Sequence, residues 1–469
     1  MCGVVGVHAP GQDAARLAAL GLFALQHRGQ ESAGLAVSDG SDVMVYKDLG
    51  LVDQVLDERR LQSLRGELAS AHCRYSTTGS TIWENSQPAL RMGPARTVAV
   101  SHNGNLVNTQ ALLEALPGGR ARLVGTTDTE LLTALIAIEP ATDLVEALLA
   151  VLPRVSGAYS LIVSDESRVV GVRDPYGFRP LVLGALSAEG AETAWILASE
   201  TAALDVIGAD FVRDVEPGEM VVLGESSGPR SIRFAEGKEQ LCVFELIYFA
   251  RPDSYMLGRN LYEVRRRMGE MLAREAPAEA DLVMPVPDTG AAAAAGYAEA
   301  SGIPYREGMV RNRYAGRTFI QPSNGMRQRG VTVKLSALRE QVRGRRLIVV
   351  DDSIVRGTTT RQIVGLLRKA GASEVHVRIS APPIFHPCFY GIDTQIETEL
   401  IASTRSTEEI REFIGADSLS YLSIGGVLDA IELPRDRFCF ACFDGNYPVP
   451  VPYDVENHKF LLEREPLAV

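Results

Sequence analysis

The sequence predicts an α/β protein of two domains, the first an αββα layered domain and the second built around a parallel sheet. In the first half, short strand-like runs separated by turns dominate, with helices expected near 14–26 and 130–151. In the second half, apolar runs alternate with helical patterns, which is typical of parallel sheets. This change of pattern divides the chain into two units.

The boundary between the two units is marked by polar, glycine-rich stretches at 224–230 and 236–240. We place it near residue 235, with domains at 2–234 and 235–469. A run of alanines at 291–295 is expected to form the buried start of a helix in the second unit.

The composition favours a large soluble enzyme. Of 469 residues, 46% are hydrophobic, enough for real cores, and the 23% that are charged argue against disorder. A net charge of −12 disfavours a nucleic-acid partner, because binding phosphates needs a basic face. No apolar stretch approaches the roughly 20 residues that span a membrane, and the first residues lack the form of a signal peptide. We therefore expect a cytoplasmic protein.

Cys2 is the strongest candidate for a reactive residue, and it precedes a short apolar run at 3–7. If Met1 is removed, Cys2 carries both a thiol and a free α-amine, which gives a nucleophile its own general base. The alternative is that Cys2 is a buried small hydrophobe at the start of a strand, as a lone cysteine near a terminus usually is. Three further segments decide between these interpretations.

These segments are LQHRGQESAG at 25–34, HCRYSTTG at 72–79 and AVSHNGN at 99–105. Each taken alone is a loop or a tight turn after a helical or strand-like run. In combination they resemble the glutaminase domain of N-terminal-nucleophile (Ntn) amidotransferases, which release ammonia from glutamine with an amino-terminal cysteine. The resemblance covers about the first half of the chain.

The resemblance implies a role for each matching residue. The Cys2 thiol would attack the glutamine carboxamide, and the Asn103 side chain and the Gly104 N–H would hold the resulting oxyanion. Arg74 would grip the α-carboxylate of glutamine, a task suited to a planar fork of donors, and Asp128 would receive the α-ammonium. The glutamine-binding residues implied are Arg28, Arg74 and Asp128.

The second half contains a run at 345–360 with a charged start, an apolar strand, two carboxylates and a loop rich in Gly and Thr, before a helix expected at 361–370. Paired carboxylates at the end of a strand can hold ribose hydroxyls and a divalent metal. The N–H groups of the loop and the helix start, with Thr hydroxyls, can cradle a phosphate. The alternative is an ordinary crossover in which an Asp caps the helix.

The run resembles the phosphoribosyl diphosphate (PRPP) signature of type I phosphoribosyltransferases, in the extended form DDSIVRGTT of the amidophosphoribosyltransferase family. Segments at 173–181, 249–254 and 312–320 also resemble that family. The resemblance implies that ammonia from glutamine attacks C1 of PRPP through an enclosed passage and gives 5-phosphoribosylamine, in the first committed step of purine synthesis. It also implies a homotetramer and inhibition by purine nucleotides.

Several segments would contact PRPP in this family. VPDTG at 286–290 matches the loop that binds the diphosphate, with Thr289 where relatives carry Ser, and 312–334 matches a segment that closes over PRPP. Mg²⁺ would be held by Thr289, Asp351 and Asp352. The PRPP-binding residues implied are Asp288, Thr289, Gly290, Arg317, Lys334, Asp351, Asp352, Ser353, Arg356, Gly357, Thr358 and Thr359.

Four further cysteines raise the question of a second cofactor: Cys242, Cys388, Cys439 and Cys442. In a chain that is not secreted they point to metal or cluster binding rather than disulfides, and the Cys-x-x-Cys spacing alone leaves zinc and redox chemistry open. Their surroundings resemble the iron-sulfur subgroup of the family, which implies one structural 4Fe-4S cluster held by all four thiolates. Cys73 is expected in the core.

Two other functions are weighed against this one. A glutaminase domain can feed a different acceptor, such as a sugar phosphate or an aspartyl adenylate, but the run at 345–360 fits PRPP. A regulator that only senses PRPP would lack the N-terminal cysteine domain and would usually bring a basic DNA-binding module. The sequence therefore favours an enzyme with two coupled sites.

Overall fold

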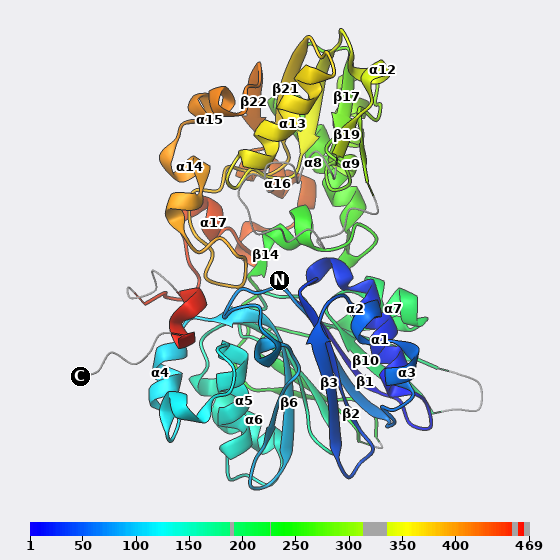
Figure 1. The fold of residues 1–469 in the computed structure, drawn as a ribbon, viewed down its shortest axis with the longest axis vertical. Helices are drawn as coiled ribbons and strands as arrows, with labels where there is room; N and C mark the ends of the chain where they lie inside the picture. Colours follow the sequence, from blue (N-terminus) through cyan, green and yellow to red (C-terminus); the bar gives the residue numbers. More distant parts are fainter. Residues whose placement is uncertain (188–191, 226, 313–334, 453–457, 464–469) are drawn as a thin grey trace.

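The structure is a computed structural model that describes residues 1–187, 192–225, 227–312, 335–452 and 458–463. Two halves are stacked along the longest axis of the molecule, and the N-terminus lies between them (Figure 1). The lower half contains two antiparallel sheets and the upper half a parallel sheet. The predicted fold class, an αββα domain followed by a parallel α/β domain, is confirmed.

The lower half is built on two stacked sheets. The first has the order β11-β9-β10-β1-β4-β2-β3 and the second the order β13-β12-β8-β7-β6-β5. In chain order the strands of the first are β1 (Gly3–His8), β2 (Ser32–Ser38), β3 (Val43–Leu49), β4 (Leu68–Arg74), β9 (Val182–Leu186), β10 (Ala194–Ala198) and β11 (Asp210–Asp214). Those of the second are β5 (Ala89–Met92), β6 (Thr97–Leu106), β7 (Gly157–Ser164), β8 (Val169–Arg173), β12 (Glu219–Leu223) and β13 (Arg230–Arg233).

Helices cover the outer face of each sheet. Helices α1 (Ala14–Ala24) and α7 (Thr201–Ile207) pack on the first sheet, and α5 (Asp128–Ile138) and α6 (Leu144–Val151) on the second. The sheets meet through side chains such as Val4 and Ile162, both fully buried. Shorter helices are α2 (Val52–Val55), α3 (Glu58–Leu61) and α4 (Thr109–Glu114).

The helical region expected at 130–151 is divided into two helices. Helix α5 ends at Ile138 and α6 begins at Leu144. Pro140 lies between them and has no N–H to continue the helical ladder, and Asp143 caps α6 by accepting from the N–H groups of Val145 and Glu146. The proline and the cap therefore divide a region that apolar periodicity alone predicts as one helix.

The upper half contains a parallel sheet with the order β17-β20-β21-β22 among the described residues. Its strands are β17 (Leu282–Pro285), β20 (Arg346–Asp351), β21 (Glu374–Ile379) and β22 (Ser418–Tyr421). The helices are α8 (Leu261–Glu275), α9 (Ala291–Ser301), α12 (Arg339–Val342), α13 (Thr358–Lys369), α14 (Ile401–Thr404), α15 (Thr407–Ile414), α16 (Ile424–Ile431) and α17 (Ala441–Asp444). Three two-stranded pairs complete it: β14 (Leu241–Cys242) with β23 (Phe438–Cys439), β15 (Tyr255–Met256) with β16 (Arg259–Asn260), and β18 (Met309–Arg311) with β19 (Leu335–Ala337).

The alanine run begins helix α9, as predicted, and its small side chains let α9 lie very close to α8. A Cβ on Gly269 of α8 would lie 1.8 Å from the carbonyl oxygen of Ala293, and one on Gly296 of α9 would lie 1.8 Å from that of Arg266. Each helix thus needs glycine where the other backbone passes. The contact holds α9, and the loop before it, in a fixed position on the sheet.

The chain passes from the lower half to the upper half between β13 and β14. The last strand of the lower sheets ends at Arg233, and β14 of the upper half begins at Leu241. The final described segment, a 3₁₀ helix at His458–Glu463, returns to the lower half, where Leu462 is 2% exposed in the core beneath α5 and α6. The segment at 458–463 therefore packs against the lower half.

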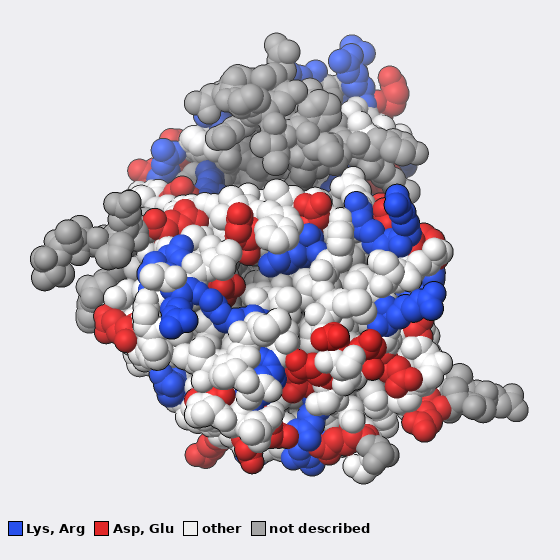
Figure 2. All heavy atoms as spheres, turned by 60° about the horizontal axis from the view of Figure 1, so that its bottom comes forward, with Lys and Arg blue, Asp and Glu red and all other residues white. Residues whose placement is uncertain are grey.

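The surface carries both signs of charge. On the described part of the face in Figure 2, Lys and Arg are interspersed with Asp and Glu. None of the helices in the described ranges has the length and apolar character needed to cross a membrane.

Candidate active sites

A pocket in the lower half collects side chains around Cys2. It is formed where the two sheets and the start of α5 meet, and it holds Cys2, Arg74, Gly104 and Asp128 of the predicted set. Its other lining residues are Tyr75, Thr77, Thr78, Gln87, His102, Thr127 and Thr129. A cation, an anion, a thiol and several hydroxyls thus surround one small space.

Cys2 is buried immediately before β1. Its Sγ lies 3.5 Å from both the backbone nitrogen and the carbonyl oxygen of Tyr75, and its own nitrogen donates to Asn103 Oδ1 at 3.1 Å. Burial raises the pKa of the Cys2 thiol, while loss of hydration lowers the pKa of the buried Met1 α-amine to about 6. The raised pKa favours the protonated form of the Cys2 thiol, and the lowered pKa favours the neutral form of the Met1 amine.

The Asn103 side chain has an unused donor. Its Nδ2 is buried and makes no hydrogen bond to the described residues, although a buried amide donor without a partner is costly. Asn103 and Gly104 lie within β6, which continues to Leu106, so they do not form the tight turn that an Asn-Gly pair suggests. A Cβ on Gly104 would lie 2.0 Å from the carbonyl oxygen of Ala158, so the backbone passes closer than any other residue permits. This is the position predicted for the oxyanion donors.

Arg74 and Asp128 give the pocket one wall of each charge. Arg74 is 2% exposed and donates to the carbonyl oxygens of Thr78 and Ser80, at 2.8 and 3.1 Å. Asp128 begins α5, and its carboxylate accepts from the N–H of Leu106 at 3.0 Å. A cation and an anion fixed in one pocket suit a zwitterionic amino acid.

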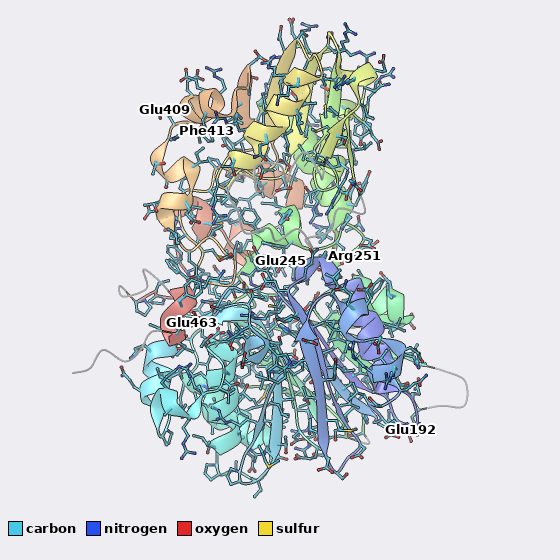
Figure 3. The ribbon with its side chains drawn as sticks, viewed as in Figure 1. Glu192, Glu245, Arg251, Glu409, Phe413 and Glu463 are labelled. Carbon is cyan, nitrogen blue, oxygen red and sulfur yellow. The ribbon has the colours of Figure 1, made fainter. Side chains whose placement is uncertain are left out.

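Arg28 lies outside this pocket. It donates to Glu245 Oε2 of the upper half at 2.7 Å and to Glu200 Oε1, and both ion pairs are buried. Burial alone would raise the pKa of Glu200, but the Arg28 charge holds that pKa below its usual range. Glu245 lies between the two halves in Figure 3. Arg28 therefore joins the halves, and its predicted contact with glutamine has no support in this geometry.

Two further buried side chains line the pocket: His102, for which the sequence favours a positional and hydrogen-bonding role over an acid-base one, and Gln87, which the sequence does not single out. The His102 ring nitrogen Nδ1 lies 3.1 Å from Thr129 Oγ1. The backbone N–H of His102 donates to Gln87 Oε1 at 2.8 Å. Gln87 Nε2 donates to the same Thr129 hydroxyl at 3.0 Å. His102 stands inside the motif at 99–105, but Gln87 lies in a loop with no motif, so only the tertiary structure identifies it.

The second predicted site lies at the carboxyl end of β20. Asp351 and Asp352 are 8% and 7% exposed, and Ser353 Oγ donates to Asp352 Oδ1 at 2.6 Å. Burial, and then repulsion from Asp352, raises the pKa of Asp351 well above its usual value. Burial likewise raises the pKa of Asp352, against hydrogen bonds from Ser353 and Thr289. A cation bound between these two buried carboxylates would relieve their repulsion, so the pair suits a cation site.

The loop between β17 and α9 approaches the carboxylate pair. Gly290 makes this possible, because a Cβ there would lie 2.3 Å from the carbonyl oxygen of Val350. Thr289 faces Asp352, as the predicted metal role requires, whereas Asp288 points outward and pairs with Arg311 at 3.0 Å. The loop and the end of β20 thus form one polar edge of the sheet.

The loop after Asp352 leads into the start of α13. Gly357 caps the helix with φ at +71°, a conformation that favours glycine, and α13 begins at Thr358 rather than at 361. Thr358 and Thr359 therefore occupy the first helical positions, where free N–H groups face outward. Arg356 pairs with Glu399. The predicted residues Arg317 and Lys334 lie outside the described residues.

Arg265 of α8 is a functional candidate that our sequence interpretation did not single out. It is 5% exposed, its charge acts on Asp352, and it donates to the carbonyl oxygens of Leu246 and Ala250 at 2.8 and 2.7 Å. It lies on the buried, apolar face of its helix with Leu261 and Met268. A charged residue at such a position is the sequence feature from which a functional role could have been inferred.

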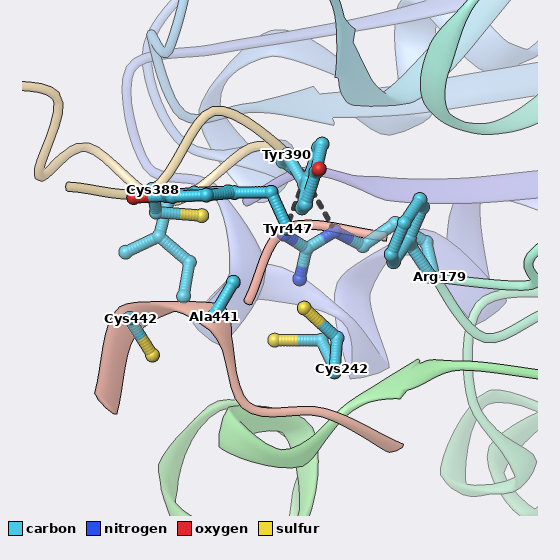
Figure 4. A pocket seen from close by; sticks show the side chains of 10 residues that line it. Arg179, Cys242, Cys388, Tyr390, Ala441, Cys442 and Tyr447 are labelled. Carbon is cyan, nitrogen blue, oxygen red and sulfur yellow. Dashed lines mark hydrogen bonds between the residues drawn. The ribbon is translucent and has the colours of Figure 1, made fainter. Parts of the chain in front are cut away.

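The four predicted cluster cysteines line one pocket between the halves. Strands β14 and β23 pair in parallel with Cys242 opposite Cys439, and α17 supplies Cys442. In Figure 4 the sulfur atoms of Cys242, Cys388 and Cys442 face a shared space beside Arg179. Burial raises the pKa of Cys242 to about 11, and that of Cys442 well above its usual value. Within the described ranges no three His, Cys, Asp or Glu side chains are spaced to hold a single metal ion.

Comparisons with known proteins address the whole chain. A model of a glutamine amidotransferase domain matches residues 72–206, and a model of a phosphoribosyl transferase domain matches residues 257–382. The chain is 53% identical to an amidophosphoribosyltransferase of Synechococcus elongatus, over 98% of this chain and 94% of the relative.

Two solved structures are similar over almost the full length. One is described as the allosteric regulatory enzyme of purine biosynthesis. It has a TM-score of 0.90 at 45% identity, and the match covers 98% of this chain and 98% of that one. The other is the glutamine PRPP amidotransferase of Bacillus subtilis complexed with ADP and GMP, with a TM-score of 0.89 at 45% identity, over 97% of this chain and 98% of that one. The resemblance found in the motifs is thereby confirmed, and the chain belongs to the amidophosphoribosyltransferase family.

Proposed function

We propose that this chain converts PRPP, glutamine and water to 5-phosphoribosylamine, glutamate and diphosphate, with Cys2 as the nucleophile of the glutaminase reaction. The observation that carries the proposal is the pocket around Cys2, which unites a buried thiol with the charged groups of Arg74 and Asp128. Asn103 adjoins it, since its Oδ1 accepts from the Cys2 nitrogen at 3.1 Å while its Nδ2 has no partner among the described residues. The charges of Arg74 and Asp128 fit the two ends of an amino acid, and the thiol and the amide fit the chemistry at its side chain.

In the glutaminase half-reaction, the Cys2 thiol gives its proton to the Cys2 amine, which removal of Met1 frees, and its sulfur attacks the carboxamide carbon. The oxyanion that forms accepts hydrogen bonds from Asn103 Nδ2 and the Gly104 N–H. Transfer of the proton to nitrogen releases ammonia and leaves a thioester, which water then cleaves to glutamate. Throughout, Arg74 and Asp128 hold the α-carboxylate and α-ammonium.

In the phosphoribosyl half-reaction, ammonia attacks C1 of PRPP and the diphosphate leaves. The N–H groups and hydroxyls at 353–359 would hold the 5-phosphate, and the loop at 288–290 would hold the diphosphate. Asp351, Asp352 and Thr289 would hold Mg²⁺, which supplies positive charge to the leaving diphosphate when it is bound. The fit is supported by the raised pKa values of the two acids, because a cation favours their ionised forms.

The proposed function is tested by stoichiometry. Enzyme purified without oxygen should release glutamate and diphosphate in equal amounts, because each ammonia released consumes one PRPP, and glutamate release should fall sharply without PRPP and Mg²⁺. Both products are measured in the same reaction, with a reaction lacking only PRPP as the control. Glutamate release that is indifferent to PRPP, with no diphosphate, would leave an amidotransferase with a different acceptor.

We also propose that the four cysteines hold a 4Fe-4S cluster. Four buried thiols around one pocket fit its ligand set. The cluster would be structural, because its ligands join β14, β23, α17 and the loop at 388 in the junction between the halves.

Iron and sulfide analysis tests this assignment. Protein isolated without oxygen should contain about four irons and four sulfides per chain. Cys439→Ser should lose both, while Cys73→Ala, at a buried cysteine of β4 away from the pocket, should keep both. One zinc per chain and no sulfide would contradict the cluster. The readout is elemental analysis with the visible absorption of the cluster, so it does not depend on activity.

Three further features remain proposals: a homotetramer, inhibition by purine nucleotides and a cytoplasmic location. The related structure that contains ADP and GMP supports the second of these.

A further inference from the structure

One wall of the glutamine pocket is a loop, residues 75–80, which we call the pocket roof. Tyr75, Thr77 and Thr78 of the roof line the pocket. From inside, Arg74 holds the roof by donating to the carbonyl oxygens of Thr78, Gly79 and Ser80 at 2.8, 3.3 and 3.1 Å. Because one guanidinium both faces the pocket and binds the roof, the position of the roof determines how Arg74 is presented to a ligand.

From outside, the roof is held by residues from the other end of the chain. The N–H of Ser80 donates to Glu463 Oε1 at 2.6 Å. The N–H of Gly79 donates to the carbonyl oxygen of Lys459 at 2.6 Å, and Gln395 Nε2 donates to the carbonyl oxygen of Thr77 at 3.2 Å. The backbone groups of three roof residues are thus bonded to residues more than 300 positions away in sequence.

The segment that holds the roof is itself anchored in the lower half. Leu462 is buried in the core beneath α5 and α6, and its carbonyl oxygen accepts from Arg120 Nε at 2.7 Å. Glu463 also accepts from the Thr126 hydroxyl at 3.1 Å, next to the pocket residues Thr127 and Asp128. In Figure 3 Glu463 lies beside the lower half, far from the parallel sheet. The Glu463 carboxylate therefore links the roof to the start of α5.

The same segment is tied to the upper half. Lys459 Nζ pairs with the Asp393 carboxylate at 3.1 Å, and Asp393 stands two residues before Gln395. The loop that carries both continues past Gly391, where a Cβ would lie 3.1 Å from the backbone of Gly104. This loop of the upper half and the end of the chain therefore reach the pocket together.

We propose that Gln395, Lys459 and Glu463 form a clamp, contributed by the phosphoribosyltransferase part of the chain, that positions the pocket roof and thereby sets the affinity for glutamine. These are positioning residues, because they touch the roof and not the substrate. The proposal rests on the proposed role of the pocket around Cys2 as the glutamine site. It gives the second half of the chain a direct mechanical hold on the site of the first.

The test compares variants of Glu463 in the full-length enzyme. Glu463→Ala removes the acceptor for Ser80 and should raise KM for glutamine about tenfold, as the loss of a charge-assisted hydrogen bond predicts. Glu463→Gln keeps an oxygen acceptor and should stay within about threefold of the parent enzyme. The activity with ammonia in place of glutamine should be unchanged in both, because ammonia does not use the roof.

Two further measurements separate positioning from general stability. Lys459→Met and Asp393→Asn should each raise KM for glutamine, and the double variant should be no worse than the stronger single one, because both remove the same ion pair. The rate at which 6-diazo-5-oxo-L-norleucine alkylates Cys2 should fall in parallel with kcat/KM. Glu412→Ala, at an exposed carboxylate of α15, is the matched control and should behave as the parent.

A KM for glutamine within twofold of the parent in both Glu463→Ala and Lys459→Met would overturn the clamp. So would a loss of ammonia-dependent activity equal to the loss with glutamine, since that would indicate a general folding defect. Failure of the underlying glutamine site gives a different result, namely a Cys2→Ala enzyme that still uses glutamine.

Discussion

Cys2→Ala should abolish glutamine-dependent synthesis of 5-phosphoribosylamine, with a loss of about 10⁴-fold or more, and should leave ammonia-dependent synthesis close to that of the parent. The Cys2 thiol is the nucleophile proposed for the pocket, and none of the hydroxyl side chains that line the pocket carries a neighbouring α-amine that could serve as its base. The acceptor site at Asp351 is in the other half of the molecule and receives ammonia from any source. Product is measured with each nitrogen donor in turn at saturating PRPP and Mg²⁺.

Cys73→Ala is the matched control for this experiment. Cys73 is a buried cysteine directly opposite Gly3 in the β1–β4 pair, but its sulfur faces the carbonyl oxygen of Leu25 and not the pocket. It should therefore retain both activities. Continued use of glutamine by Cys2→Ala would refute the assignment of the nucleophile. Mass analysis of the parent should show a chain without Met1, because a retained Met1 blocks the amine that serves as base.

Four of the residues that line the pocket around Cys2 could be predicted from the sequence, because they lie in short segments that are specific in combination. Cys2, Arg74, Gly104 and Asp128 come from four separate places in the chain, and the stacking of two sheets with α5 brings them together. The sequence segments indicate which chemical role each residue could have, and the fold then brings these residues into one pocket. The same holds for Asp351 and Asp352, which the apolar strand before them places at the edge of a parallel sheet.

Arg28 shows where this kind of inference fails. It stands in a motif, but its side chain turns to Glu245, which is 217 residues away in sequence and belongs to the other half. Nothing in the local sequence distinguishes an arginine that faces a substrate from one that faces a buried carboxylate. Gln87 fails in the opposite way, because it lines the pocket from a loop with no recognisable pattern.

The helix boundaries were missed for simpler reasons. Apolar periodicity alone joins α5 to α6, and only Pro140 and the cap at Asp143 separate them. Helix α13 begins three residues earlier than expected, because Gly357 adopts a left-handed conformation that ends the loop there. The clamp on the pocket roof was beyond sequence analysis, since no signal links Glu463 with Ser80 before the chain is folded.

Asp351→Asn and Asp352→Asn should give the opposite phenotype to Cys2→Ala, with synthesis lost from both glutamine and ammonia by about 10³-fold. In the proposed site each acid would act in its ionised form to hold the ribose and the metal, and an amide cannot supply that charge. The Cys2 site is left intact in both variants, so glutamate release without coupled synthesis should persist at the basal level. Diphosphate release, glutamate release and PRPP binding are measured separately.

The pH dependence follows from the direction of the pKa shifts. Burial and mutual repulsion raise the pKa of Asp351, and burial raises that of Asp352, so both acids take up protons at a higher pH than a free aspartic acid. As the pH falls from neutral, the affinity for PRPP with Mg²⁺ should therefore fall earlier than for an exposed carboxylate. Asp281→Asn is the control, since Asp281 lies at the opposite end of β17, is exposed, and has its pKa lowered by hydrogen bonds from Arg346.

Stability supplies the test that separates function from folding. A folded state that binds more protons than the unfolded chain loses stability as the pH rises from the unfolded pKa through the raised folded one. Without Mg²⁺ and PRPP, the two acids therefore destabilise the folded protein at neutral pH, and replacing either by Asn should raise Tm. A variant that melts at a higher temperature and yet makes no product has lost chemistry and not structure. If Tm falls together with activity, the two acids serve the fold, and the assignment of the PRPP site is wrong.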